Sequence, residues 1–183
     1  MKAAASGGGF MPSRPARDAH IVPAFSLQGL LLLPLAMALP ILANGLGGLF
    51  TMQALQTWYP ALAKPFFTPP DIVFPLVWTF IYALMTLAFW RILRVKAPLG
   101  EKSTAFGFFL LQLSLNIGWS YAFFGQQSPR AGLVVVSLLF IAITLTIRAF
   151  RRLDGPAGYA FYPCLVWVGF AGILNAAIVI LNP

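Results

Sequence analysis

The sequence predicts an all-α integral membrane protein, a bundle of five transmembrane helices with a cytoplasmic N-terminus. Of its 183 residues, 60% are hydrophobic and only 9% are charged, which is more apolar surface than a soluble domain can bury. Five stretches carry no charged residue, and each is long enough to cross about 30 Å of hydrocarbon. These stretches lack the strict alternation of apolar and polar residues that a transmembrane β-barrel requires.

The apolar stretches divide the chain into a tail and one membrane domain. Residues 1–26 are expected to form a disordered N-terminal tail, because Ala, Gly, Ser, Pro and Arg dominate there and offer no apolar face to bury. Residues 27–183 are expected to form the five-helix domain. Its helices are predicted at about residues 27–50, 72–94, 103–125, 129–149 and 156–181.

The basic residues predict the orientation of the bundle. Lys64 and Arg130 fall on one side of the predicted membrane, and the other ten of the 12 basic residues fall on the side of the N-terminus. The positive-inside rule therefore predicts a cytoplasmic N-terminus and an outer C-terminus. Topology accounts for the net charge of +8, so the expected partner is the lipid bilayer and not nucleic acid.

Three predicted helices carry stripes that mix large aromatic residues with amides or hydroxyls at helical spacing. The stripes consist of Trp78, Tyr82, Met85 and Phe89, of Gln112, Asn116, Trp119 and Phe123, and of Trp167, Ala171 and Asn175. A single stripe is typical of helix packing, where an interhelical hydrogen bond contributes less than ~2 kcal/mol. Three stripes in one small bundle favour a central cavity, mostly apolar with a few orienting polar groups.

The sequence offers little for acid–base or metal chemistry. None of its four acidic residues lies in the middle of a predicted helix, and its one histidine, His20, lies in the tail. No metal site and no cofactor are therefore expected, and ion-coupled transport is disfavoured because it relies on intramembrane ionisable residues. Asp71 is interpreted as the cap of the second helix, and Cys164 as a small buried apolar residue.

Three segments resemble the tryptophan-rich sensory protein/translocator protein family (TspO/MBR), also called peripheral-type benzodiazepine receptors. The segment WYPALAKPFFTPP, which starts at Trp58, is similar to the family pattern W-Y-x-x-L-x-K-P-x-W-x-P-P. LQLSLNIGWSYAFF and YPCLVWVGFAGILN resemble the family's third and fifth helices. The sequence departs from the family at Phe67 and Cys164, where a Trp and a Tyr are usual, and Ile72 replaces an aromatic residue.

The resemblance implies a ligand cavity and a lid. The ligand-binding residues carried over from the family are Tyr59, Phe74, Trp78, Tyr82, Asn116, Trp119, Trp167 and Ala171. The loop between the first two helices would form the lid, because proline restricts the conformations that a closing loop must lose. Its residues are Lys64, Pro65, Phe67, Pro69 and Pro70. Lys64 is expected either to meet a ligand propionate or to extend to the membrane surface as an ordinary structural lysine.

The function that the resemblance implies is a membrane receptor or sensor for tetrapyrroles such as protoporphyrin IX and haem, with a regulatory role in their traffic or degradation. Two alternatives stay open. One is a light- and oxygen-dependent porphyrin-degrading enzyme, with Trp78 and Trp167 as candidate catalytic residues, and the other is a passive transporter of tetrapyrrole or lipid. The resemblance also implies a homodimer. The expected location is a bacterial cytoplasmic membrane, with an outer membrane as the alternative.

Overall fold

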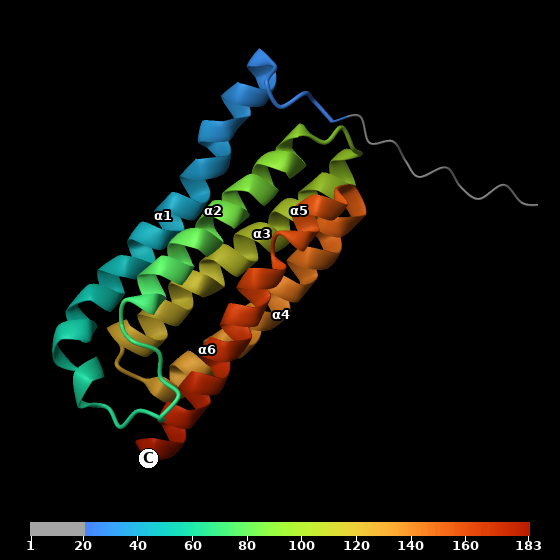
Figure 1. Cartoon of the computed structure of the whole chain (residues 1–183). Helices are drawn as coiled ribbons and strands as arrows, with labels where there is room; N and C mark the ends of the chain where they lie inside the picture. Colours follow the sequence, from blue (N-terminus) through green and yellow to red (C-terminus); the bar gives the residue numbers. More distant parts are fainter. Residues whose placement is uncertain (1–20) are drawn as a thin grey trace, which may run out of the picture.

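The computed structural model describes residues 21–183, which form a bundle of helices running along one common direction (Figure 1). The short α5 and the longer α6 together correspond to the fifth predicted helix, so the predicted all-α five-helix bundle is confirmed. Within the described residues, the only strand-like pairing is an isolated bridge between Ile21 and Val95. The elements are α1 (Leu27–Thr57), a 3₁₀ turn (Tyr59–Ala61), α2 (Val73–Arg94), α3 (Leu99–Ser120), a π-helical turn (Tyr121–Gly125), α4 (Pro129–Leu153), α5 (Gly155–Tyr159) and α6 (Tyr162–Leu181).

Four segments of the described chain are long and apolar enough to cross a membrane: α1, α2, α4 and the α5–α6 segment Gly155–Leu181. The remaining helix of the bundle, α3, packs between α1 and α4. It is less apolar because it carries Glu101 and Lys102 in its first turns and the amides of Gln112 and Asn116 further along. A helix placed between two others in this way does not need an apolar surface on every side.

Helix α1 is longer than the sequence pattern predicts. It ends at Thr57 and not near Phe50, and its 31 residues correspond to about 46 Å at 1.5 Å per residue. This exceeds the hydrocarbon thickness of about 30 Å. The helix continues through Pro34 and Pro40. Ser26 caps its start, because the Ser26 hydroxyl oxygen accepts a hydrogen bond from the backbone N–H of Gly29 at 3.1 Å.

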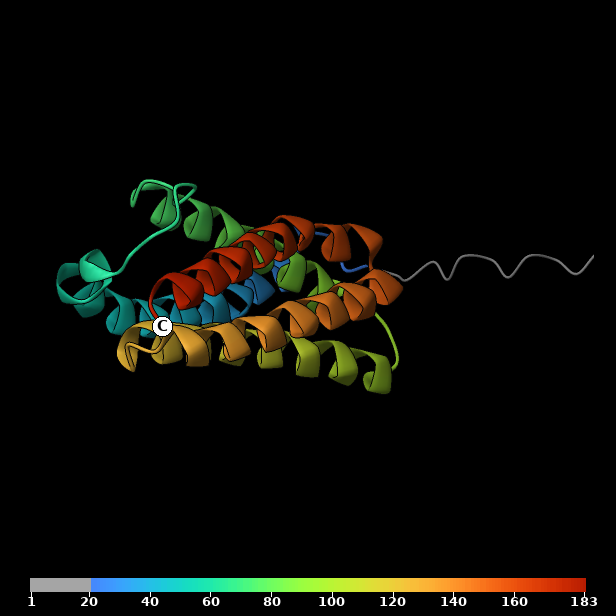
Figure 2. The same ribbon diagram turned by 90° about the horizontal axis from the view of Figure 1, so that it is seen from below.

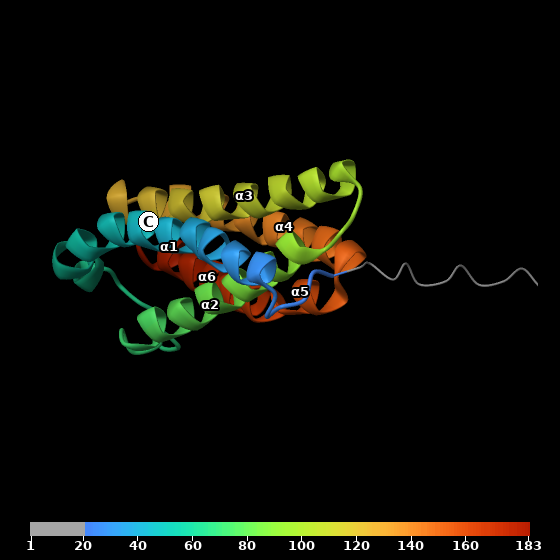
Figure 3. The same cartoon turned by 90° about the horizontal axis from the view of Figure 1, so that it is seen from above.

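The long helices pack in the order α2, α1, α3, α4, α6, and the short α5 packs against both α4 and α2. Helix α3 packs against α4, α4 packs against α6, and α1 packs against both α2 and α3. Seen from above, α1 lies between α2 and α3 (Figure 3). Seen from below, the segment that joins α1 to α2 lies at the same end of the bundle as the C-terminus (Figure 2).

Aromatic side chains fill the end of the bundle farther from the C-terminus. Phe89 of α2 and Phe109 of α3 stack with their ring centroids 4.3 Å apart. Phe150 of α4 and Phe161, the residue before α6, complete the cluster, and their ring centroids lie 5.9 Å and 6.2 Å from that of Phe109. Phe109, Phe150 and Phe161 are fully buried. This half of the bundle is therefore solid, which leaves the other half for a ligand site.

The residues before α1 are held against the end of α2. The backbone N–H of Val22 donates to the carbonyl oxygen of Arg94, and Arg94 Nε donates to the carbonyl oxygen of Val22 at 2.8 Å. Trp90 Nε1 donates to the carbonyl oxygen of Gly29, also at 2.8 Å. The expected disordered tail spans residues 1–26. Residues 21–26 are placed by these contacts, and residues 1–20 lie outside the described residues.

Candidate functional site

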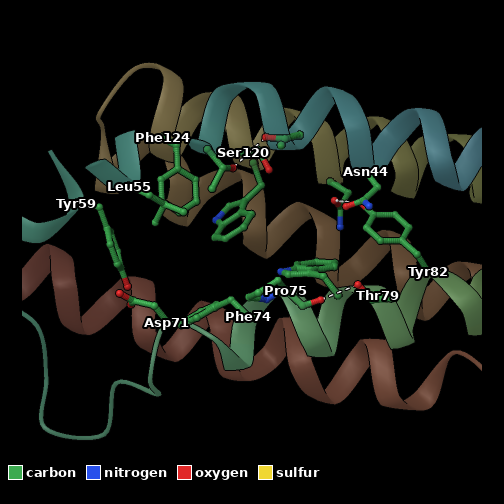
Figure 4. A pocket seen from close by; sticks show the side chains of 16 residues that line it. Asn44, Leu55, Tyr59, Asp71, Phe74, Pro75, Thr79, Tyr82, Ser120 and Phe124 are labelled. Carbon is green, nitrogen blue, oxygen red and sulfur yellow. Dashed lines mark hydrogen bonds between the residues drawn. The ribbon is translucent and has the colours of Figure 1, made fainter. Parts of the chain in front are cut away.

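A cavity of about 340 Å³ lies between α1, α2 and α3, in the half of the bundle nearer the C-terminus. Its volume is in the range of sites for small organic ligands. Figure 4 shows its lining side chains converging from these helices. The lining residues are Asn44, Gly47, Gly48, Thr51, Leu55, Tyr59, Asp71, Phe74, Pro75, Trp78, Thr79, Tyr82, Asn116, Trp119, Ser120 and Phe124.

Helical spacing places the rings on two facing walls. On α2, Phe74, Trp78 and Tyr82 recur every four residues and share one face. On α3, Trp119 faces Trp78, and the centroids of their rings are 6.5 Å apart. The rings of Trp78 and Tyr82 are 5.7 Å apart. The walls therefore present flat aromatic surfaces that suit a flat, apolar ligand.

The amides and indoles of this region form a partly completed hydrogen-bond network. The hydroxyl of Tyr82 donates to Asn116 Oδ1 at 2.8 Å. Trp119 Nε1 donates to Asn175 Oδ1 at 3.4 Å, and Asn175 Nδ2 donates to the carbonyl oxygen of Pro129 at 2.7 Å. Asn116 Nδ2 is buried and has no hydrogen-bond partner among the described residues. The network thus leaves one donor unused on the cavity wall.

Helix α1 forms the third wall, and its small residues let it approach α3. A Cβ atom at Gly47 would lie only 3.1 Å from Ser120 Oγ, which is tighter than an ordinary van der Waals contact. Asn44 before Gly47, and Thr51 and Leu55 after it, lie on the same face at helical spacing and line the cavity. Their side chains are partly or largely exposed, and so are those of Pro75 and Thr79 opposite on α2. The cavity is therefore open on the side between α1 and α2.

Tyr59 and Asp71 close one end of the cavity, where their polar groups point toward one another (Figure 4). Burial raises the pKa of the Tyr59 phenol above its usual value of 10.0, and the negative charge of Asp71 raises this pKa further. Tyr59 is therefore a neutral phenol at physiological pH. Asp71 does not cap α2 through its side chain, since α2 begins at Val73 without a side-chain cap.

The proline-rich loop lies against α6 and not over the cavity. Ala63 exchanges two hydrogen bonds with the Asn182 side chain, both 3.0 Å long. Phe67 contacts Phe170 of α6, with ring centroids 6.4 Å apart. Lys64 Nζ lies 4.4 Å from the centroid of the Tyr59 ring. None of the five lid candidates, Lys64, Pro65, Phe67, Pro69 and Pro70, lines the cavity in this arrangement.

The structure brings together six of the eight side chains predicted to contact a ligand. Tyr59, Phe74, Trp78, Tyr82, Asn116 and Trp119 line the cavity. Trp167 does not, because it packs behind Phe74, with their ring centroids 5.7 Å apart. Ala171 lines a separate small cavity of about 20 Å³, which Tyr59, Phe74, Trp119 and Phe124 separate from the larger one.

Sequence reasoning missed the contribution of α1. Asn44, Gly47, Thr51 and Leu55 recur at intervals of three or four residues and all line the cavity. This spacing is visible in the sequence, but small residues at helical spacing are also typical of positions where membrane helices approach each other, so the spacing alone does not predict a cavity wall. Within the described residues, no three His, Cys, Asp or Glu side chains lie close enough together to hold a metal ion.

The fold and the site define an α-helical integral membrane protein with an aromatic cavity open toward one side of the bundle. Comparison with known families extends this result, since residues 36–181 match the model of the TspO/MBR family. The chain therefore belongs to the TspO/MBR family, and the predicted resemblance is confirmed.

Individual relatives are similar over most of their length. The chain is 42% identical over 154 residues to the tryptophan-rich protein TspO of Chlorobaculum tepidum, covering 84% of this chain and 98% of that protein. It is 31% identical to Protein CrtK of Rhodobacter capsulatus, covering 77% of this chain and 86% of the relative. It is 30% identical to the translocator protein of Bos taurus, covering 75% of this chain and 82% of the relative.

Proposed function

We propose that this protein is a membrane receptor or sensor that binds a tetrapyrrole, such as protoporphyrin IX or haem, in the cavity between α1, α2 and α3. Binding would regulate the traffic or degradation of the tetrapyrrole. The observation that carries the proposal is the pair of facing indoles, Trp78 and Trp119, 6.5 Å apart in a cavity that is open between α1 and α2. A macrocycle larger than the cavity would extend through that open side.

The chemistry of the cavity supports the proposal. Aromatic and aliphatic side chains form most of its wall, and the polar groups are few, as expected for a site that takes a flat apolar ligand. Lys64 lies beside Tyr59 at the end of the cavity. A propionate that projects past Tyr59 would meet this ammonium group, whereas Asp71 would repel a propionate placed on its own side.

Tryptophan fluorescence tests the proposal. Adding protoporphyrin IX to the purified protein should quench the fluorescence, and Trp78→Phe should remove a large share of the saturable quenching. Trp90→Phe is the matched control, because Trp90 hydrogen-bonds Gly29 at the other end of the bundle. Wild-type protein that shows no saturable quenching with protoporphyrin IX or haem would overturn the proposal.

Light-dependent porphyrin degradation is the second candidate function, and the position of Trp78 on the cavity wall favours it. An indole in contact with a bound porphyrin can exchange an electron with the excited ring, and oxygen would be the co-reactant. Trp167 would act only indirectly, because Phe74 lies between it and the cavity. Illumination under oxygen should bleach the bound porphyrin at a rate that falls in Trp78→Phe much more than in Trp167→Phe. Equal rates in wild type and Trp78→Phe would exclude Trp78 as a catalytic residue.

We also propose a bacterial cytoplasmic membrane as the location and a homodimer as the assembly. Small residues could let two copies approach each other, but Ala43 and Gly47 of α1 are buried inside the bundle. Gly107 of α3 instead faces outward, with nothing within 4 Å of a Cβ placed there. Crosslinking through Gly107→Cys in native membranes would test this face, and failure to form a covalent dimer would argue against it.

A further inference from the structure

Three arginines lie close together at the end of α4, at the opposite end of the bundle from the cavity. Arg148, Arg151 and Arg152 fall within the last two turns of the helix, and all three are exposed. Asp154, the acidic residue nearest to them in the sequence, is buried, and both of its carboxylate oxygens already accept hydrogen bonds from Arg91. The positive charges of the three arginines are therefore not neutralised by this carboxylate.

The segment that leads into α6 holds the side chain of Arg151 in place. Its guanidinium lies over the ring of Tyr159, 5.0 Å from the centroid, and its Nη1 donates to the hydroxyl of Tyr162 at 3.4 Å. The two tyrosine rings stack, with their centroids 6.0 Å apart. Gly158 makes room for the arginine, because a Cβ there would overlap Arg151 Cγ. A guanidinium has five N–H groups, so these contacts orient its plane and leave donors free for a further partner.

We propose that Arg148, Arg151, Arg152, Tyr159 and Tyr162, here called the arginine–tyrosine surface, bind the phosphate headgroup of an anionic phospholipid. A planar guanidinium can donate two parallel N–H groups to two oxygens of one phosphate, and the guanidinium of Arg151 is already oriented. The inference is independent of the proposed function, because the arginine–tyrosine surface shares no residue with the cavity lining.

Exposed apolar residues beside the arginine–tyrosine surface indicate that its occupant is a lipid. On α4, Val134 and Ile141 precede Arg148 at intervals of seven residues, about two helical turns, and they are 61% and 55% exposed. On α6, which packs against α4, Val166 lies one turn after Tyr162 and is 72% exposed. In a membrane-spanning bundle such residues face acyl chains. Arg148 and Tyr162 therefore stand where the acyl chains of a lipid would meet its headgroup.

A simpler role for the three arginines is to set the orientation of the bundle and to complement the negative end of the α4 dipole. That role requires positive charge, but it requires neither the stacked tyrosines nor any preference among lipids. The predicted orientation also places the arginine–tyrosine surface at the cytoplasmic face of the membrane, which carries negative charge. Near such a surface, one arginine contributes about fivefold to the affinity for anionic lipid.

The test compares phosphatidylglycerol with phosphatidylcholine of the same acyl chains. Wild-type protein and one variant are titrated together in one detergent solution, and native mass spectrometry separates them by mass and gives the equilibrium constant for the first bound lipid. The variants are Arg151→Gln, Arg148→Gln and Tyr159→Leu. The matched control is Arg130→Gln, which removes an exposed charge from the opposite end of the same helix. A further titration uses sn-glycerol 3-phosphate, which carries a phosphate group without acyl chains.

The wild type should bind phosphatidylglycerol several times more tightly than phosphatidylcholine. Arg151→Gln and Arg148→Gln should each lower the affinity for phosphatidylglycerol about fivefold, and Tyr159→Leu should lower it about two- to fivefold. All three variants should bind phosphatidylcholine as the wild type does, and Arg130→Gln should change neither affinity.

Equal affinities of the wild type for the two lipids would overturn the proposal, and so would an equal loss of affinity in Arg130→Gln and Arg151→Gln. Binding of sn-glycerol 3-phosphate as tight as that of phosphatidylglycerol would overturn the assignment of a lipid. Unchanged affinity in Tyr159→Leu would overturn the role of the stacked rings. Neither the cavity nor a tetrapyrrole takes part in the test, so its outcome does not depend on the proposed function.

Discussion

Individual amide side chains join the helices of this bundle at depths where water is scarce. Asn175 of α6 is the clearest case, because it accepts from Trp119 of α3 and donates to the carbonyl oxygen of Pro129 at the start of α4. Both ends of this amide are used, whereas Asn116 Nδ2 has no hydrogen-bond partner within residues 21–183. The first arrangement stabilises the bundle, and the second leaves a donor on a residue that lines the cavity.

Tyr59 gives a pH-dependent signal at the end of the cavity. Burial and, to a lesser degree, the charge of Asp71 raise its pKa above the value of 10.0 that applies in the unfolded chain. The stabilisation from neutral Tyr59 is therefore fully present below pH 10.0 and is lost as the pH rises through the higher pKa of the folded protein. The phenolate absorbance in alkaline titration should lose one component that titrates above pH 10.0 in Tyr59→Phe. Asp71→Asn should move that component to lower pH, and an unchanged titration in Tyr59→Phe would refute the assignment.

At the scale of elements, the π-helical turn Tyr121–Gly125 connects the site to the core. It follows α3 directly and turns Phe123 and Phe124 inward beside Trp119, with ring centroids 5.8 Å from that of Trp119 in both cases. Wide turns of this kind are frequent at functional sites. Helix α4 fits beneath the turn only because Gly132 is small, since a Cβ there would lie 2.9 Å from Phe123 Cβ and 2.9 Å from Asn175 Oδ1.

Gly132→Ala should therefore destabilise the protein. The added methyl group forces Phe123 and Asn175 apart, and overpacking of this kind typically costs ~1–3 kcal/mol of the free energy of unfolding. The matched control is Gly45→Ala, where the added Cβ meets open space and should stabilise the helix by up to ~1 kcal/mol. Unfolding in sodium dodecyl sulfate, followed by circular dichroism, measures both. Equal stability of the two variants would contradict the close approach at Gly132.

The sequence pattern predicted the bundle and much of the site, and its errors have physical causes. Hydropathy reports which residues face lipid, but a helix continues while its backbone hydrogen bonds continue. For this reason α1 passes the expected end near Phe50 and ends at Thr57. Spacing correctly predicted that Trp78 and Tyr82 share a face with each other. Spacing alone could not predict how α6 is rotated about its axis. It therefore did not reveal that Trp167 packs behind Phe74 and does not line the cavity.

The loop between α1 and α2 is fixed by contacts that the sequence did not reveal. Asn182, at the end of α6, holds Ala63 by two hydrogen bonds, while Phe66 at the tip is fully exposed. Asn182→Ala should loosen the loop, so that chymotrypsin cleaves after Phe66 several times faster than in the wild type. Ser103→Ala, which alters an exposed side chain hydrogen-bonded within the first turn of α3, should leave the rate unchanged. An unchanged cleavage rate in Asn182→Ala would show that these hydrogen bonds do not hold the loop.

At the scale of the whole molecule, the two ends of the bundle differ in charge and in construction. The end that holds α5 and the α2–α3 connection carries most of the basic residues, and several of these also join elements. Arg91 donates to both carboxylate oxygens of Asp154, at 2.6 Å and 3.0 Å, and Asp154 accepts from the backbone N–H of Ala157. Lys102 Nζ donates to the carbonyl oxygens of Leu93 and Val95 at the end of α2. Basic residues at this end thus fix helix termini and also favour the cytoplasmic side.

The opposite end carries Lys64 and Arg130, so the positive-inside rule predicts that the loop between α1 and α2 faces outward. Two variants that each add one cysteine test this orientation in intact cells, because Cys164 is buried and should not react. A membrane-impermeant maleimide should label Phe66→Cys, whose position is fully exposed in the structure. It should label Leu99→Cys, at a position 87% exposed, only after the cells are permeabilised. The reverse pattern would mean that the bundle is inserted with its cavity end toward the cytoplasm, and ligand access would then have to be sought from that side.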